Sequence, residues 1–180
     1  MKRAVFFYIT LLSLSMPGCR PEPEDVPVQT ASSIIIKTSN AAEGVATRSE
    51  ALETVVFTGD DILWFNETTK ELCFKNNSSN NPINNPFLYA TPAIRFYIND
   101  EYLFSSMIYV SDLSSQIFNS LVFHYNITEN RYFLRDGYPD TSVLMNPQKA
   151  QELRDENMRK IADEWNKFIE QLKKEGRYKN

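Results

Sequence analysis

Apolar runs separated by short polar loops alternate along residues 55–135, and this pattern predicts a series of β-hairpins. Asn99 and Asp100 separate two of these runs, and both residue types tolerate the positive φ that a tight hairpin turn requires. Alternation within the runs is only partial, which is typical of a sheet with one buried face. The predicted hairpins pair 62–65 with 71–75, 93–98 with 101–104, and 120–125 with 131–135.

Apolar residues spaced by three and four positions predict a helix at the end of the chain. Asn146 is a suitable cap, Pro147 fits the first position, and Gly176 is a suitable terminator. A helix over 147–175 would be about 44 Å long, whereas a six-residue strand spans about 20 Å. We therefore expect its charged first half to overhang the sheet, or the helix to break. The apolar stripe that should cover the buried face comprises Met158, Ile161, Trp165, Phe168 and Leu172.

The predicted fold class is α+β: an antiparallel β-meander of about six or seven strands packed against one long C-terminal helix. Residues 52–180 would form this domain. Residues 19–51 read as a tether, because three prolines between 20 and 31 disfavour a helix. Within the tether, the β-branched run 33–38 is either a first strand or an isolated apolar patch.

The N-terminus has the pattern of an export signal. Lys2 and Arg3 precede an apolar run over 4–16, which is shorter than the roughly 20 residues of a membrane span. Gly18 followed by Cys19 resembles a bacterial lipoprotein signal, in which the cysteine is lipidated and becomes the new N-terminus. A plain secretory leader with an incidental cysteine is the alternative. We expect residues 1–18 to be the signal peptide and Cys19 to be the lipidation site.

The resemblance to lipoproteins implies a location. Such proteins carry several acyl chains, which anchor a protein stably to a membrane. Acidic residues within 22–25 resemble the surface-export signal of some Gram-negative lipoproteins. We expect an outer-membrane protein, and both display at the surface and retention on the periplasmic side stay open.

The stretch 46–49 carries a second resemblance. Fimbrial subunits exported as lipoproteins often have an arginine in such a stretch, where a protease removes the leader and the first strand. A strand of a partner then fills the gap by β-augmentation. The resemblance makes Arg48 a candidate processing site, and an ordinary linker arginine is the alternative.

Composition restricts the chemistry. The net charge of −4 disfavours nucleic acid as a partner, because that binding depends on clustered Lys and Arg. A single histidine, His124, and two cysteines exclude most histidine-based metal sites and any disulfide framework. The sequence contains no nucleotide-binding, zinc-protease or serine-hydrolase motif. We therefore expect no cofactor, no bound metal and no enzymatic activity. We expect His124 at the surface or rim of the sheet and Cys73 to be a buried or half-buried free thiol. A small hydrolase that uses these two residues is the least favoured interpretation.

Aromatic residues offer the candidate ligand contacts. Trp64 and Tyr97 are the candidates, and Tyr97 shares a strand face with Arg95. Flat rings on the wet face of a sheet would suit stacking on a sugar, although core packing is the alternative. The expected function is therefore non-enzymatic binding of a protein partner or a glycan at the membrane.

Three stretches, 58–66, 131–139 and 165–178, together resemble short, uncharacterised envelope lipoproteins of gut-type anaerobic Gram-negative bacteria. The resemblance covers most of residues 52–180. It implies an envelope location and supplies no activity or site residues. The alternatives to a binding lipoprotein are a fimbria-related adhesin or assembly subunit processed after Arg48, and a small envelope hydrolase.

Overall fold

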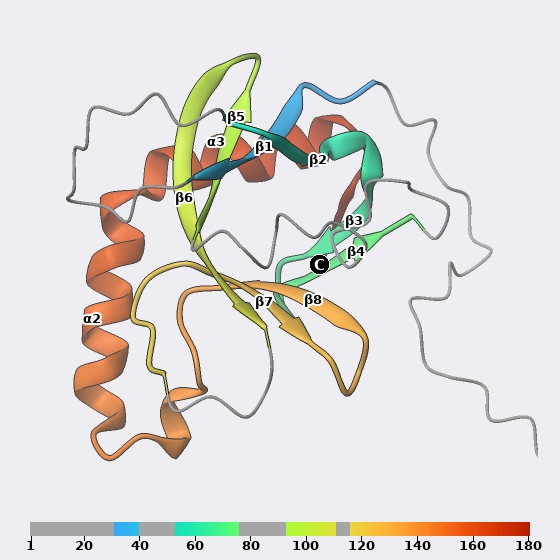
Figure 1. Ribbon diagram of the computed structural model, residues 1–180. Coiled ribbons are helices and arrows are strands. Elements are labelled where there is room, and N and C mark those ends of the chain that lie inside the picture. The colour runs from blue at the N-terminus through green and yellow to red at the C-terminus, as the bar shows by residue number, and fades with distance from the viewer. Residues whose placement is uncertain (1–30, 40–52, 76–92, 111–115) are drawn as a thin grey trace, which may run out of the picture.

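A computed structural model of the protein describes residues 31–39, 53–75, 93–110 and 116–180. It shows a mixed α+β fold in which a nine-stranded sheet is combined with two helices near the C-terminus, α2 (Pro147–Lys160) and α3 (Ala162–Lys174) (Figure 1). The strands are β1 (Ile34–Ser39), β2 (Val55–Thr58), β3 (Ile62–Asn66), β4 (Glu71–Phe74), β5 (Ala93–Ile98), β6 (Glu101–Val110), β7 (Val122–Asn126), β8 (Arg131–Arg135) and β9 (Tyr178–Lys179).

The three predicted hairpins are present as β3–β4, β5–β6 and β7–β8. Asn99 and Asp100 have φ values of 48° and 67°, as the predicted tight turn requires. The sheet differs from the predicted meander because it contains nine strands, in the order β2-β1-β5-β6-β7-β8-β4-β3-β9. It is also not purely antiparallel, since β6 pairs with β7 and β3 with β9 in parallel.

The run of β-branched residues upstream of residue 52 is a strand of the sheet. β1 lies between β2 and β5 and pairs with both in antiparallel fashion. Its side chains Ile34 and Ile36 are fully buried in the core. The folded unit thus includes a segment of the range 19–51 that the sequence assigned to a tether.

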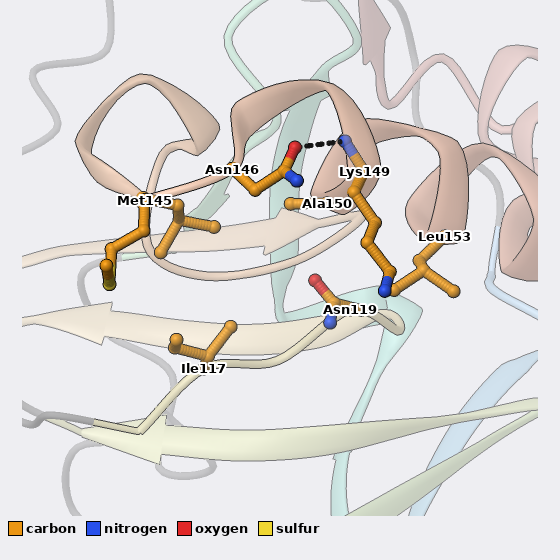
Figure 2. A pocket seen from close by; sticks show the side chains of 8 residues that line it. Ile117, Asn119, Met145, Asn146, Lys149, Ala150 and Leu153 are labelled. Carbon is orange, nitrogen blue, oxygen red and sulfur yellow. Dashed lines mark hydrogen bonds between the residues drawn. The ribbon is translucent and has the colours of Figure 1, made fainter.

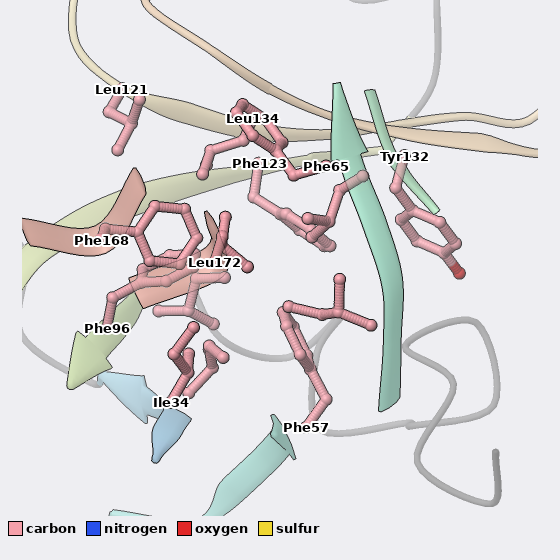
Figure 3. Packing of buried hydrophobic residues seen from close by; sticks show 14 of the residues in the cluster. Ile34, Phe57, Phe65, Phe96, Leu121, Phe123, Tyr132, Leu134, Phe168 and Leu172 are labelled. Atoms are coloured by element: carbon pink, nitrogen blue, oxygen red, sulfur yellow. The ribbon is translucent and has the colours of Figure 1, made fainter. Parts of the chain in front are cut away.

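The sheet curls until its two ends meet. β2 is at one end of the strand order and β3 is next to the other end, yet only the short 3₁₀ helix η1 (Gly59–Asp61) separates them along the chain. The ring of Phe57 on β2 lies 4.9 Å from that of Phe74 on β4 and 5.7 Å from that of Phe123 on β7. These contacts cross the inside of the curl and form one half of the core (Figure 3).

Helix α3 fills the other half of the concave face, as the apolar stripe predicted. Phe168 is fully buried, and its ring lies 5.5 Å from Phe96, 5.6 Å from Phe104 and 6.3 Å from Phe65. Trp165, Ile169 and Leu172 are also buried on this face. The helix therefore joins strands from both ends of the sheet through one continuous apolar surface.

The single long helix of the prediction is in fact broken at Ile161, whose ψ of 16° ends α2. Asn146 caps α2 by accepting a hydrogen bond from the Lys149 backbone N–H at 3.1 Å. Among the residues of α2, only Ala150 and Arg154 are buried, and Figure 1 shows the helix running away from the sheet. The expected overhang of the charged half is present, and the break lets α3 follow the curl while α2 takes another direction.

A polar network connects the C-terminal segment to the start of β1. The Arg177 side chain is buried and donates to the Ile62 carbonyl at 2.8 Å, to Asp60 Oδ1 at 2.7 Å and to Glu175 Oε2 at 3.2 Å. Glu175 Oε1 in turn accepts from the Ser33 backbone N–H at 3.0 Å. The network holds η1, β3 and the entry of β1 together where the curled sheet closes.

Candidate functional site

Large apolar side chains that are exposed in the described part of the chain gather mainly on two surfaces. The first, which we call the α2-start surface, comprises Ile117, Val143, Met145 and Leu153. The second lies on the outer face of the sheet and includes Val55 and Tyr102. Exposed apolar clusters mark interaction sites more often than isolated exposed residues do, so these two surfaces are the candidates for function.

Two polar caps flank the exposed residues Val143 and Met145 of the α2-start surface. Asp140 Oδ1 accepts from the Ser142 backbone N–H at 2.9 Å and starts the 3₁₀ helix η3 (Thr141–Val143). Asn146 starts α2 immediately afterwards. The short connection between the two caps leaves Met145 completely exposed and Val143 70% exposed. Local capping chemistry, rather than core packing, therefore sets the position of these side chains.

A shallow pocket of about 270 Å³ lies within the α2-start surface. Figure 2 shows Ile117 and Met145 on one side of it and Leu153 on the other, with the Lys149 side chain running toward Leu153. Asn119 and Asn146 provide the remaining polar groups among its lining residues, and Leu144 and Ala150 complete the lining. The lining is thus mainly apolar with amides and one cation, which suits an apolar side chain with a polar backbone.

The walls of this pocket are fixed by hydrogen bonds. Asn157 Nδ2 donates to the Asn119 carbonyl at 2.7 Å, which holds the segment with Ile117 against α2. Arg154 Nη2 donates to the Pro139 carbonyl at 2.7 Å, which holds the segment before η3. Gly137 permits this packing, because a Cβ there would lie 2.2 Å from Arg154 Nε. The pocket is therefore preformed by contacts between α2 and the segments that flank it.

The second surface consists of two rows of residues across neighbouring strands, and we call it the outer array. Strand pairing aligns Lys37 with Arg95 and Arg95 with Ser105. The adjacent row aligns Ile35 with Tyr97 and Tyr97 with Tyr102. Side chains two positions apart point to the same face of a strand, which places Ile35 with Lys37 and Tyr97 with Arg95. On β6 a register shift opposite Phe96 and Tyr97 brings Tyr102 to the face of Ser105, and the two hydroxyl groups lie 3.0 Å apart. Both rows therefore share the outer face, opposite the face that buries Ile36 and Phe96.

Tyr97 lies at the centre of the outer array but is only 8% exposed. Lys37 Nζ lies 4.7 Å from the centre of its ring, and the ring of Tyr102 meets it edge-on at 5.8 Å. The Tyr97 hydroxyl donates to Glu53 Oε1 at 3.0 Å. Trp64, the other predicted contact, lies on β3, far along the strand order from β5, with Lys179 Nζ 4.7 Å from its ring centre. The two predicted aromatic contacts therefore do not share one site.

Charge in the outer array is centred on Glu53. Its carboxylate accepts from Arg95 Nη1 at 2.8 Å, and Lys37 Nζ lies 3.7 Å from its second oxygen. Burial alone would raise the pKa of Glu53, but hydrogen bonds from Tyr97 and Arg95 and the charge of Lys37 outweigh burial and lower it. Burial and the hydrogen bond to Glu53 raise the pKa of Tyr97. Glu53 thus stays ionised and Tyr97 stays protonated near neutral pH.

The residues of the hydrolase alternative are both buried. Cys73 is fully buried, as predicted, and its Sγ lies 3.8 Å from the Phe74 carbonyl. His124 is only 1% exposed, so the prediction of a surface histidine is wrong. Its ring packs between those of Phe133 at 5.9 Å and Tyr138 at 4.9 Å, because this part of the outer sheet face is covered. Within the described residues, no group of three or more His, Cys, Asp or Glu side chains is placed to hold a metal ion.

Two predicted site residues, Cys19 and Arg48, lie outside the described residues. The α2-start surface, in contrast, was not predicted as a site from the sequence. Its signal was weak: Leu153 interrupts a charged helix half, and Val143, Leu144 and Met145 form a short apolar run between polar residues. Such a run reads equally well as core, and only the two caps around it show that it is exposed.

Comparison of the chain with protein-family models, with curated proteins and with solved structures gives no match. Neither α2 nor α3, nor any other helix in the described ranges, has the length and apolar composition that a membrane span requires. The two surfaces and the N-terminal sequence are therefore the features that bear on function.

Proposed function

We propose that this protein is a lipid-anchored envelope protein without catalytic activity, which binds a protein partner through the α2-start surface. The clustering of the exposed side chains of Ile117, Met145 and Leu153 around a preformed pocket is the observation that carries the proposal. Hydroxyl-rich sugars need many polar contacts, whereas this lining is mainly apolar. A buried apolar anchor from a protein partner fits it better.

The position of the surface supports the anchored arrangement. Residues 20–30 between the proposed lipidated Cys19 and the described chain span at most about 40 Å. The described chain begins at β1, and Figure 1 places the start of β1 and the start of α2 at opposite ends of the molecule. A domain tethered through β1 can therefore present the α2-start surface away from the outer membrane.

Site-specific photo-crosslinking in cells tests the partner. A photoreactive residue in place of Met145 should yield one discrete crosslinked protein. The matched control is the same residue in place of Ile127, which is 55% exposed on the β7–β8 hairpin, close to the 57% of Ile117. Ile117→Asp, but not Ile127→Asp, should abolish the crosslink from position 145. Identical products from positions 145 and 127, or no product from 145, would rule out this surface.

The fimbrial alternative is favoured by a separate observation. β1 lies upstream of Arg48 in the chain and is paired on both sides, with Ile34 and Ile36 fully buried. Cleavage after Arg48 would leave β1 held only by non-covalent contacts, and its loss would open a groove for a partner's strand. N-terminal sequencing of the cell-surface protein tests this alternative. A mature chain that begins at Ser49 in the wild type, and not in Arg48→Ala, would favour it over the first proposal.

A further inference from the structure

The outer array combines a fixed exposed ring with fixed charges. Tyr102 is 47% exposed, so its ring is accessible where that of Tyr97 is not. Its hydroxyl is within 3.0 Å of Ser105 Oγ, and Tyr97 contacts its edge. Two contacts thus hold the Tyr102 ring in one orientation before any ligand arrives, which reduces the entropy cost of binding.

Among the described residues, the array carries more positive than negative charge. Within them, Lys37 and Arg95 face one carboxylate, that of Glu53, in a protein whose net charge is −4. Arg95 has five N–H donors and Lys37 three, and the described partners Glu53 and Tyr97 use only some of them. As far as the described chain shows, the guanidinium and the ammonium therefore have donors that can bind a second anion. A carboxylate is one of the anions that a guanidinium fork binds in bidentate fashion.

The ring and the cations are close enough to act on one ligand. Tyr102 lies opposite Tyr97, and Tyr97 is two positions from Arg95 on β5. Diagonal neighbours of this kind have Cα atoms about 7–8 Å apart, within reach of aromatic and long side chains. Glu53 and the hydroxyl groups of Tyr102 and Ser105 add hydrogen-bonding groups between them.

We propose that the outer array binds an acidic sugar unit of a glycan, with the pyranose face against Tyr102 and the sugar carboxylate at Lys37 and Arg95. An aromatic ring can cover the apolar C–H face of a pyranose, while the polar groups around it bind hydroxyls. An acidic peptide would pair with the cations equally well. Unlike a pyranose, however, it has no flat C–H face to stack on the rigid ring and no set of hydroxyls for the polar groups around that ring. This site is separate from the α2-start surface and does not depend on the proposed partner binding or on lipidation.

The test uses the full mature chain, extracted in detergent, on an array of uronate- and sialate-terminated oligosaccharides with their neutral counterparts. At least one acidic oligosaccharide should be retained, and its Kd by calorimetry should be at least about tenfold lower than that of its neutral counterpart. Tyr102→Ala and Lys37→Met should each raise that Kd about tenfold. Lys167→Met is the matched control, because Lys167, like the half-buried Lys37, is a lysine paired with one described carboxylate, that of Glu101.

Several results would overturn the assignment. One is that the protein retains no acidic oligosaccharide on the array, and another is that it binds the neutral counterpart or a poly-glutamate peptide as tightly as the acidic sugar. A third is that the variants Lys37→Met and Lys167→Met change the Kd equally. The variant Ile117→Asp distinguishes this inference from the proposed function. It should abolish crosslinking from position 145 and leave the affinity for the glycan unchanged. Loss of glycan affinity in Ile117→Asp would show that the outer array is not an independent site.

Discussion

Arg177 is a buried residue that links the C-terminal segment to η1 and β3, where the curled sheet closes. Its side chain is 1% exposed and contacts the Ile62 carbonyl and the carboxylates of Asp60 and Glu175. The nearby Gly59 allows the approach of the β1 entry, because a Cβ at Gly59 would lie 1.9 Å from Ser32 Oγ. The sequence gives little indication of this role, since an arginine close to a chain end is normally exposed.

Arg177→Met is expected to lower the free energy of unfolding by about 3–5 kcal/mol, because it leaves the buried carboxylate of Glu175 without its cation. Urea denaturation measures the change. Lys160→Met removes an exposed pair with Glu156 and should change the free energy by only about 0.5 kcal/mol. Similar values for the two variants would show that the Arg177 network does not close the sheet.

Glu53 gives a pH dependence at the residue scale. Its pKa in the folded protein is lowered from the ordinary value of 4.5, so the folded state favours the ionised form. The stabilisation by Glu53 is therefore complete above the unfolded pKa and disappears as the pH falls through the lower folded pKa. The difference in unfolding free energy between wild type and Glu53→Gln should be larger at pH 7 than at pH 3. A difference that is unchanged or larger at pH 3 would contradict the ion-paired arrangement.

At the scale of elements, the sequence predicted the features that depend on neighbouring residues alone, namely turns and helix ends. The Asn99–Asp100 turn, the Asn146 cap and the terminator Gly176, with a φ of 68°, all match the structure. The parallel pairs β6–β7 and β3–β9 could not be predicted, because strand order depends on how distant segments pack. The length of the predicted helix allowed either an overhang or a break, and the structure shows both, with the break at Ile161.

The two helices should differ in their contribution to stability. Phe168→Ala on α3 removes a ring that contacts Phe65, Phe96 and Phe104, and should cost about 3–5 kcal/mol of unfolding free energy. Leu153→Ala on α2 truncates a side chain that is already exposed and should cost about 0.5 kcal/mol or less. Urea denaturation of both variants provides the comparison. A large loss for Leu153→Ala would mean that α2 is part of the core rather than the support of a binding surface.

At the scale of the whole molecule, a curled sheet and two helices place the two candidate binding surfaces on the outside of the fold. The spacing of apolar residues predicted that the helical segment now seen as α3 would cover the buried face of the sheet, because an apolar helix stripe faces the core. It could not predict the α2-start surface, since the sequence does not tell whether Val143 and Met145 face the core or solvent. It also could not tell that Tyr97 would be covered by Lys37 while Tyr102 stayed accessible.

The anchored arrangement depends on Cys19, and metabolic labelling with a fatty acid tests it most directly. The wild-type protein should carry the label and fractionate with the outer membrane. Cys19→Ala should carry none, because the thiol that accepts the lipid is missing. An unlabelled wild-type protein that is recovered from the soluble fraction with residues 1–18 still attached would contradict the account.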